Sequence, residues 1–275
     1  MKRITMNGCL FALAVTAAAS AQTMSLVPRG GTGNSIAVAP CATVTIDVYA
    51  QGIAPDLLRA YQATLPLTAT GGASGSVGHD GAVPMINSGH PDYVFAALTA
   101  SGTGSVDGLP LVVNALQFAG DSVSVTTSMY LGEFQYEVST NASGSFTIDA
   151  VDPGTNPSVN DSFLVDRFDQ PIAFTTIPAQ ITACNDLDVC TWDVPAGSSC
   201  TNTPNAYGDV NHTGIPVDIF DILCVLDGFA GVYTTCPCLD TDIAGCPGGD
   251  GIIDIFDILA VLDAFAGVSA CSCPG

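Results

Sequence analysis

Aspartate, asparagine and threonine recur at alternate positions in two short stretches near the C-terminal end of the 275-residue chain. Oxygen-bearing side chains at alternate positions can point toward one centre, and calcium takes about six to eight oxygen ligands. In an EF-hand loop the ligands come from positions 1, 3, 5, 7, 9 and 12, with glycine at position 6 for the sharp turn. Both stretches follow this pattern in part, so each predicts a calcium site.

The first stretch matches the beginning of the loop well. Gly214 falls at position 6, but a strict count places Phe220, which cannot ligate, at position 12. We therefore interpret Pro216 as one extra residue in a loop of 13 residues. The predicted ligands of the first site are Asp209, Asn211, Thr213, the carbonyl group of Ile215, Asp218 and Asp221.

The second stretch matches the end of the loop and departs at its beginning. Counting back from Gly251 at position 6 places Cys246 and Gly248 at positions 1 and 3, where neither ligates. We expect the missing ligands from residues 240–242, reached past an insertion. The predicted ligands of the second site are Asp240, Asp242, Asp250, the carbonyl group of Ile252, Asp254 and Asp257. An alternative stays open, since aspartate at a helix start also caps the helix without any metal.

Each predicted loop continues into a short apolar segment, and these segments are nearly identical. Residues 217–232 and 253–268 differ at only three of sixteen positions. Their apolar residues recur at helical spacing, and Gly231 and Gly267 are natural helix ends. Helices this short are marginal alone, so we expect their apolar faces to pack on one another.

A loop followed by a helix, repeated about 36 residues along the chain, resembles the type I dockerin. The matching segments are 209–214, 217–223 and 250–259. The resemblance implies that calcium folds the module and that the helix faces dock a cohesin-type partner. In dockerins, the two residues just before the last calcium ligand, often Ser-Thr, recognise the partner. The residues at these positions here are Ile219-Phe220 and Ile255-Phe256. These apolar pairs either form an exposed docking patch or complete a disulfide-stapled core.

The N-terminal residues and the cysteines indicate export. Residues 1–21 combine a basic start, an apolar run and the small-residue sequence Ala19-Ser20-Ala21, which is typical of a signal peptide. Ten cysteines follow it, and all but Cys41 lie in the last third of the chain. An oxidising compartment favours disulfides over zinc sites. We predict a secreted protein whose C-terminal unit is stapled by disulfides.

The charge balance excludes several partners. The net charge is −21, and after the predicted signal peptide the basic residues are Arg29, Arg59 and Arg167. Nucleic acid and anionic membranes both require a cationic surface. The three histidines fall in separate turn-like stretches, so no nucleophile–base arrangement can be assembled. We therefore predict no catalytic residues and no enzyme activity, although a hydrolase acting on glycans is not excluded because a carboxylate pair cannot be identified among so many aspartates.

Residues 22–183 alternate with period two, as half-buried strands do. In residues 43–49, for example, Val44, Ile46 and Val48 share one face. Turn-like residues 141–144 between two alternating runs predict a hairpin. Many short strands with frequent turns predict a mainly β protein with an antiparallel jelly-roll sandwich. The other predicted strands are 60–67, 93–98, 111–118, 122–130, 162–165, 172–175 and 180–183.

Segments 39–48, 58–62, 131–138 and 144–148 resemble the cohesin-type jelly roll, a fold shared in outline with some carbohydrate-binding modules. Residues 184–208 lose the alternation and are rich in Pro, Ser, Thr and Asn, so we predict a linker there. The predicted order is a signal peptide (1–21), a cohesin-like β-sandwich (22–183), the linker, and a small α-helical, dockerin-like repeat pair (209–275).

These observations predict a secreted, non-catalytic, calcium-binding interaction or scaffolding protein. Its expected partner is a cohesin-type protein or a cell-surface component, and we expect attachment to a cell surface or to an extracellular polysaccharide-degrading assembly. The alternative is a glycan-binding module or an accessory of polysaccharide catabolism, with a polysaccharide as ligand.

Overall fold

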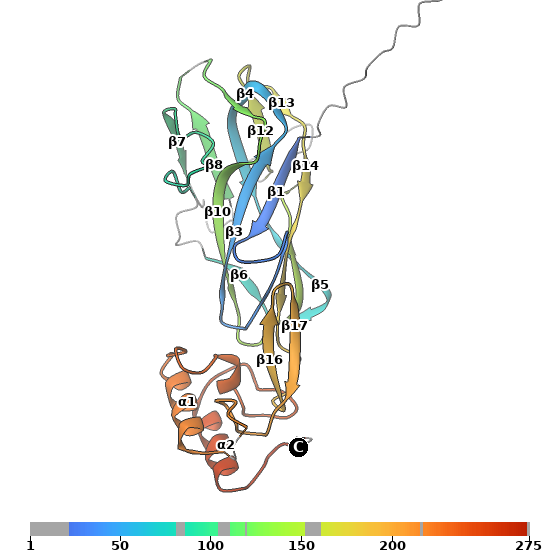
Figure 1. Cartoon of the computed structure of the whole chain (residues 1–275), viewed down its shortest axis with the longest axis vertical. Coiled ribbons are helices and arrows are strands. Elements are labelled where there is room, and N and C mark those ends of the chain that lie inside the picture. The colour runs from blue at the N-terminus through green and yellow to red at the C-terminus, as the bar shows by residue number, and fades with distance from the viewer. Residues whose placement is uncertain are drawn as a thin grey trace, which may run out of the picture.

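The computed structural model describes residues 22–80, 86–103, 111–118, 120–151, 161–214 and 217–273. A long body of β-strands carries a small helical unit at one end, with a β-hairpin beside it (Figure 1). The predicted signal peptide lies outside the described residues. No helix in the described part of the chain is long and apolar enough to cross a bilayer.

Three sheets form the β-sandwich. The first has five strands: β14 (Thr175–Ile177), β1 (Thr23–Pro28), β3 (Thr43–Gln51), β10 (Met129–Val138) and β6 (Val77–His79). The second has four: β2 (Ser35–Val38), β15 (Ala179–Ala183), β11 (Ser143–Ile148) and β5 (Leu67–Ser74). The third has six: β13 (Pro171–Ile172), β12 (Phe163–Asp166), β4 (Ile53–Thr64), β8 (Leu111–Leu116) and β7 (Ala100–Thr103), with β9 (Val123–Val125) paired to β4.

The predicted mainly β sandwich is confirmed, and the alternating residues build its core. Val44, Ile46 and Val48 of β3 are buried together with Phe134 of β10 and Phe146 of β11. Most neighbouring strands are antiparallel, as predicted. Two pairs are parallel instead, β1 with β14 and β2 with β15.

The predicted hairpin around residues 141–144 is wrong. β10 pairs with β3 and β6, whereas β11 pairs with β15 and β5, so the turn crosses from one sheet to another. The alternation reports which face of a strand is buried, and Phe134 and Phe146 are both buried in the same core. It does not report which strand accepts the backbone hydrogen bonds.

Several further predictions differ from the structure. The predicted strands 122–130 and 172–175 are each interrupted, so that β9 is separate from β10 and β13 from β14. Residues 93–98 form turns rather than a strand, and Tyr93 makes only an isolated bridge to Tyr130. The predicted linker contains a hairpin of β16 (Thr191–Ala196) and β17 (Ser199–Pro204). The disulfide between Cys184 and Cys200 ties this hairpin to the end of β15. Disulfides can order a polar segment that has little apolar surface to bury.

The helical unit contains α1 (Ile219–Phe229), the short 3-10 helix η1 (Leu239–Thr241) and α2 (Ile255–Phe265). Both helices were predicted, and they pack through Val225 and Val261, which are fully buried. The disulfide between Cys41 and Cys238 joins the sandwich to this unit. The remaining disulfides are Cys190–Cys273, Cys224–Cys236 and Cys246–Cys271.

Candidate functional site

The first loop folds around the carboxylate of Asp209. Its two oxygens accept the backbone N–H groups of Thr213 at 3.1 Å and Gly214 at 2.9 Å. At the other end of the loop, Asp221 accepts the N–H groups of Asn211 at 3.0 Å and Asp218 at 2.8 Å. Five of the predicted ligands, Asp209, Asn211, Thr213, Asp218 and Asp221, are therefore brought into one loop, closed by α1. Ile215 lies outside the described residues.

The second loop repeats these bonds with Asp242 in the place of Asp209. The oxygens of Asp242 accept the N–H groups of Asp250 at 3.1 Å and Gly251 at 2.8 Å. The acceptor lies eight residues before its first donor here, against four in the first loop. The extra residues include Cys246, which is bonded to Cys271. The insertion expected from the sequence is thus present, and Asp242 begins the second loop.

Asp257 closes the second loop as Asp221 closes the first. One oxygen accepts the N–H groups of Ile243 and Ala244, both at 2.8 Å, and the other accepts that of Asp254 at 2.7 Å. Ala244 has the place that Asn211 has in the first loop, and it offers no side-chain oxygen. Ile252 donates its N–H group to Asp250 at 3.0 Å.

Asp240 does not point to the second loop but to the first. Its Oδ2 lies 2.8 Å from Nε2 of His212, and both side chains are almost completely buried. The His212 ring stacks on Trp192 of β16 with 4.5 Å between ring centroids. Burial raises the pKa of Asp240, and the hydrogen bond from His212 opposes this shift. No pattern in the sequence connects His212, Trp192 and Asp240, which lie in three separate segments.

The aspartates at the helix starts also act as caps. Asp218 accepts the N–H group of Phe220 and Asp254 that of Phe256, both at 2.7 Å, and each begins a capping box with Asp221 or Asp257. Such caps stabilise a helix by about 1 kcal/mol each without any metal. The capping interpretation therefore describes real bonds, and calcium would act in addition to them.

No lysine or arginine lies near the buried carboxylates in the sequence. Asp209, Asp221, Asp242 and Asp257 are all buried, and residues 184–275 contain no lysine or arginine. Burial raises the pKa of Asp242 to about 6, and the charges of Asp257 and Asp250 add to this shift. Burial also raises the pKa of Asp257.

Oxygen donors of this kind suit a hard cation such as calcium, so the chemistry of the donor set fits the predicted metal. The positions of these side chains match a calcium site less well than their chemistry does. Within the described ranges, no three His, Cys, Asp or Glu side chains converge closely enough to hold a metal ion. The carboxylates accept backbone N–H groups instead.

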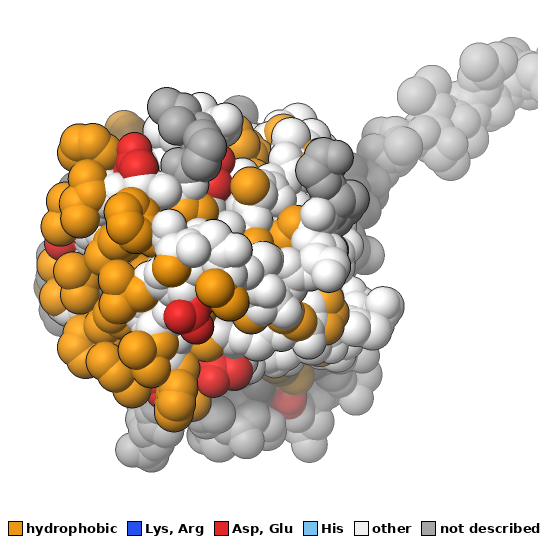
Figure 2. All heavy atoms as spheres, turned by 90° about the horizontal axis from the view of Figure 1, so that it is seen from below, with side chains coloured by type: hydrophobic (Ala, Val, Ile, Leu, Met, Phe, Trp, Pro, Cys, Tyr) orange, Lys and Arg blue, Asp and Glu red, His pale blue; other side chains and the backbone are white. Residues whose placement is uncertain are grey.

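The apolar pairs before the last predicted ligands lie on the surface. Ile219 and Phe220 are 54% and 62% exposed, and Ile255 and Phe256 are 52% and 61% exposed. Figure 2 views the end of the molecule that carries the helices, and hydrophobic side chains gather over one side of it. We call the exposed apolar residues of both helices the helix face. It consists of Ile219, Phe220, Leu223, Leu226, Phe229, Ile255, Phe256, Leu259, Leu262 and Phe265.

Comparison with known proteins returns cohesin domains among solved structures. No family model and no curated protein matches the sequence. The sixth cohesin of scaffoldin B from Acetivibrio cellulolyticus, solved in complex with a dockerin, is 11% identical, with 60% of this chain and 99% of that chain covered and a TM-score of 0.41. The third cohesin of ScaC from the same organism is 8% identical, with 59% of this chain and 98% of that chain covered and a TM-score of 0.40.

A non-cellulosomal cohesin from the archaeon Archaeoglobus fulgidus gives 9% identity, coverage of 60% of this chain and 93% of that chain, and a TM-score of 0.33. At such identities and TM-scores, the matches say only what the chain is similar to.

Proposed function

We propose that this chain is an extracellular, non-catalytic interaction protein that docks another protein through the helix face. The observation that carries the proposal is the exposure of five large apolar side chains at equal positions on each of two helices. Contiguous apolar surface of this kind is characteristic of interaction sites. The core of the helical unit does not need these residues, because Val225 and Val261 already fill the contact between the helices.

The energy available from the helix face supports a specific complex. Burying one large apolar side chain contributes about 1.5–3 kcal/mol. Interfaces concentrate their binding energy in a few large residues, so Phe220 and Phe256 at the two helix starts are the natural anchors. The two copies present the same residues, and a partner that recognises one copy can recognise the other.

Calcium, in this proposal, fixes the orientation of the two helix starts. The residues that would hold it are Asp209, Asn211, Thr213, Asp218 and Asp221 in the first loop, and Asp242, Asp250, Asp254 and Asp257 in the second. The support is the burial of Asp209, Asp221, Asp242 and Asp257 without a lysine or arginine nearby in sequence. A bound divalent cation would favour their charged forms. Asp221 and Asp257 lie in the first turns of the helices, so the cation would act directly on the helix face.

The dockerin-like repeat suggests a cohesin-type protein as the partner class, and the predicted signal peptide and five disulfides suggest that the two meet outside the cell. This partner assignment rests on the motif.

The experiment compares capture of a cohesin-type protein by the oxidised parent chain, by a test variant with four substitutions on the helix face and by a control variant with two substitutions on the sandwich. In the test variant, Ile219, Phe220, Ile255 and Phe256 are replaced by Ser. The matched control replaces Phe118 and Phe168, which are 60% and 64% exposed on the sandwich, by Ser.

We expect the test variant to lose at least a hundredfold in affinity, the control to bind as the parent does, and chelation to weaken binding by the parent. Unchanged binding by the test variant would show that the helix face is not the docking site. A chelator without effect on a folded, binding-competent chain would remove calcium from the proposal.

A further inference from the structure

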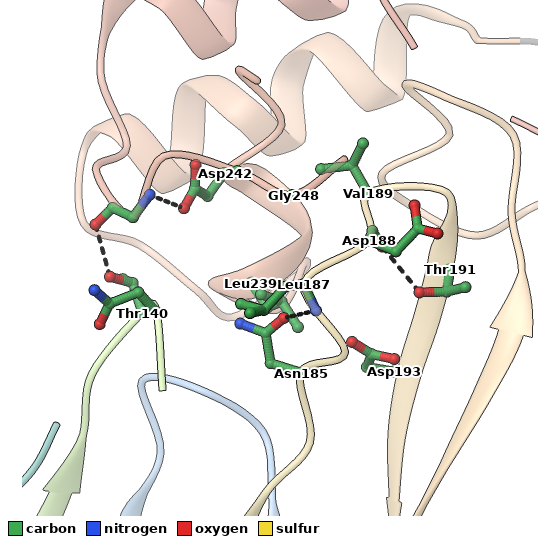
Figure 3. A pocket seen from close by; sticks show the side chains of 13 residues that line it. Thr140, Asn185, Leu187, Asp188, Val189, Thr191, Asp193, Leu239, Asp242 and Gly248 are labelled. Atoms are coloured by element: carbon green, nitrogen blue, oxygen red, sulfur yellow. Dashed lines mark hydrogen bonds between the residues drawn. The ribbon is translucent and has the colours of Figure 1, made fainter. Parts of the chain in front are cut away.

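A small cavity lies where the sandwich, the segment 185–193 and the helical unit meet (Figure 3). Its volume is about 40 Å³, enough for one or two water-sized groups. We call it the junction cavity. Its polar lining comes from all three parts: Thr140, Asn185, Asp188, Asp193 and Asp242.

Asp193 is the unusual member of this lining. The residue is only 7% exposed. Its Oδ2 accepts the N–H group of Asp186 at 3.1 Å, whereas its Oδ1 is buried and has no hydrogen-bond partner. A buried carboxylate oxygen without a partner is costly, because it has lost its water and gained nothing in exchange.

The charges around Asp193 increase this cost. Burial raises the pKa of Asp193 to about 6, and the negative charges of Asp186, Asp240 and Asp188 add to the shift. Residues 184–275 contain no lysine or arginine that could compensate. A bound cation would compensate the negative charges at this junction.

Hydrogen bonds and a disulfide hold the segment 185–193 in place beside the cavity. The side chain of Asp186 accepts the N–H group of Asp188 at 3.0 Å and the hydroxyl group of Thr191 at 2.8 Å. Asp188 accepts the N–H group of Cys190 at 2.9 Å, and Cys190 is bonded to Cys273. These bonds fix the oxygens beside the cavity before any ligand arrives.

We propose that the junction cavity binds a divalent cation of the calcium class, with Oδ1 of Asp193 as a ligand. The lining offers carboxylate, amide and hydroxyl oxygens, which calcium accepts in a flexible geometry. All ten cysteines of the described residues are bonded in disulfides, so none of them provides a thiolate, the ligand that softer metals prefer. Since no three acidic, His or Cys side chains among the described residues converge on one point, Asn185, which lies on the same side of the cavity as Asp193, and water would complete the shell (Figure 3).

The cavity that would hold the cation lies between the sandwich and the helical unit. Thr140 at the end of the sandwich donates its hydroxyl to the carbonyl group of Gly251 at 2.8 Å, across the same junction. Asp242 lines the cavity, but its two oxygens already accept the N–H groups of Asp250 and Gly251. Asp242 belongs to the second loop, so the cavity adjoins that loop, and Oδ1 of Asp193 is the ligand that the two sites would not share.

The test is calorimetric titration of the oxidised, chelator-treated full chain with Ca²⁺. We compare the parent with Asp193→Asn, which keeps an acceptor for the N–H group of Asp186. The matched control is Asp227→Asn, which removes an exposed carboxylate from α1. A third chain, Asp209→Asn with Asp257→Asn, weakens both loop sites.

We expect Asp193→Asn to lose one Ca²⁺ or to weaken it at least tenfold, and the control to match the parent. The loop variant should keep one Ca²⁺ that Asp193→Asn then removes. If the loops fail to bind calcium, the parent still binds one ion through Asp193, so the two proposals fail separately. Equal numbers and affinities in the parent and Asp193→Asn would overturn the junction site.

A second readout covers altered folding. In excess chelator at pH 7, Asp193→Asn should be more stable than the parent, because an uncompensated buried charge is gone; in excess Ca²⁺ the order should reverse. The same order in both conditions would also overturn the proposal. Asp188→Asn, which keeps its acceptor for Cys190, replaces Asp193→Asn if that variant does not fold.

Discussion

Gly228 is one of the three positions at which the two helical repeats differ, and its replacement by Ala tests the packing of the helical unit. In α2 the corresponding residue is Ala264. A Cβ atom on Gly228 would lie 2.5 Å from Oγ1, 2.7 Å from Cβ and 2.9 Å from Cγ2 of Thr241. Thr241 belongs to η1 and is fully buried, so it has little room to move.

Two effects of opposite sign decide the outcome. Ala in a helix interior is favoured over Gly by about 1 kcal/mol. Overpacking a closely fitted contact costs about 1–3 kcal/mol, and three contacts below 3.0 Å place Gly228→Ala toward the upper end of that range. We expect a net loss of about 1–2 kcal/mol in the free energy of unfolding.

The assay is urea denaturation of the oxidised full chain in a double-mutant cycle with Thr241→Gly, which removes all three contacting atoms. In that background Gly228→Ala should become neutral or stabilising. Stabilisation of the parent chain by Gly228→Ala, or a cost that persists beside Thr241→Gly, would refute the packing argument.

Three further predictions use the same denaturation assay. Without calcium, the free energy of unfolding should fall by a few kcal/mol from pH 4 to pH 7. Asp193 and Asp242 have raised pKa values of about 6 in the folded state, so the folded state binds protons more tightly than the unfolded state and loses this advantage as the pH rises. A stability that does not change with pH would contradict this. Replacing Cys41 and Cys238 together by Ser should cost about 5 kcal/mol, since that disulfide closes a loop of 197 residues; a loss below about 1 kcal/mol would show that the crosslink adds little constraint. Arg29→Met should cost about 1–3 kcal/mol, because it leaves two carboxylates, bonded at 2.5 Å and 2.7 Å, without their cation; a neutral effect would show that water satisfies them.

The sequence alone determined the local structure of much of the chain. Alternation in residues 43–49 predicts a strand with Val44 and Ile46 buried, because the pleat sends successive side chains to opposite faces. Helical spacing predicts α1 and α2, and the aspartates that precede them predict their caps. These features depend on neighbours within a few residues, which the sequence shows directly.

The tertiary structure decided every feature that joins distant segments. The crossing of β10 and β11 between sheets depends on strand neighbours, and the disulfide partners depend on where the chain returns. Asp242 begins the second loop, whereas Asp240 meets His212, although only one residue separates them. Tertiary packing directs Asp240 to the first loop and Asp242 to the second.

The helix face and the junction cavity show the same division. The sequence marked Ile219 and Phe220 as an unusual pair but left their burial open, because apolar spacing does not say which side of a helix meets the core. Asp193 gave no signal in a segment that resembled a linker. Its buried, unpartnered oxygen depends on tertiary contacts, which also bring Asp240, distant in the sequence, close enough to raise its pKa.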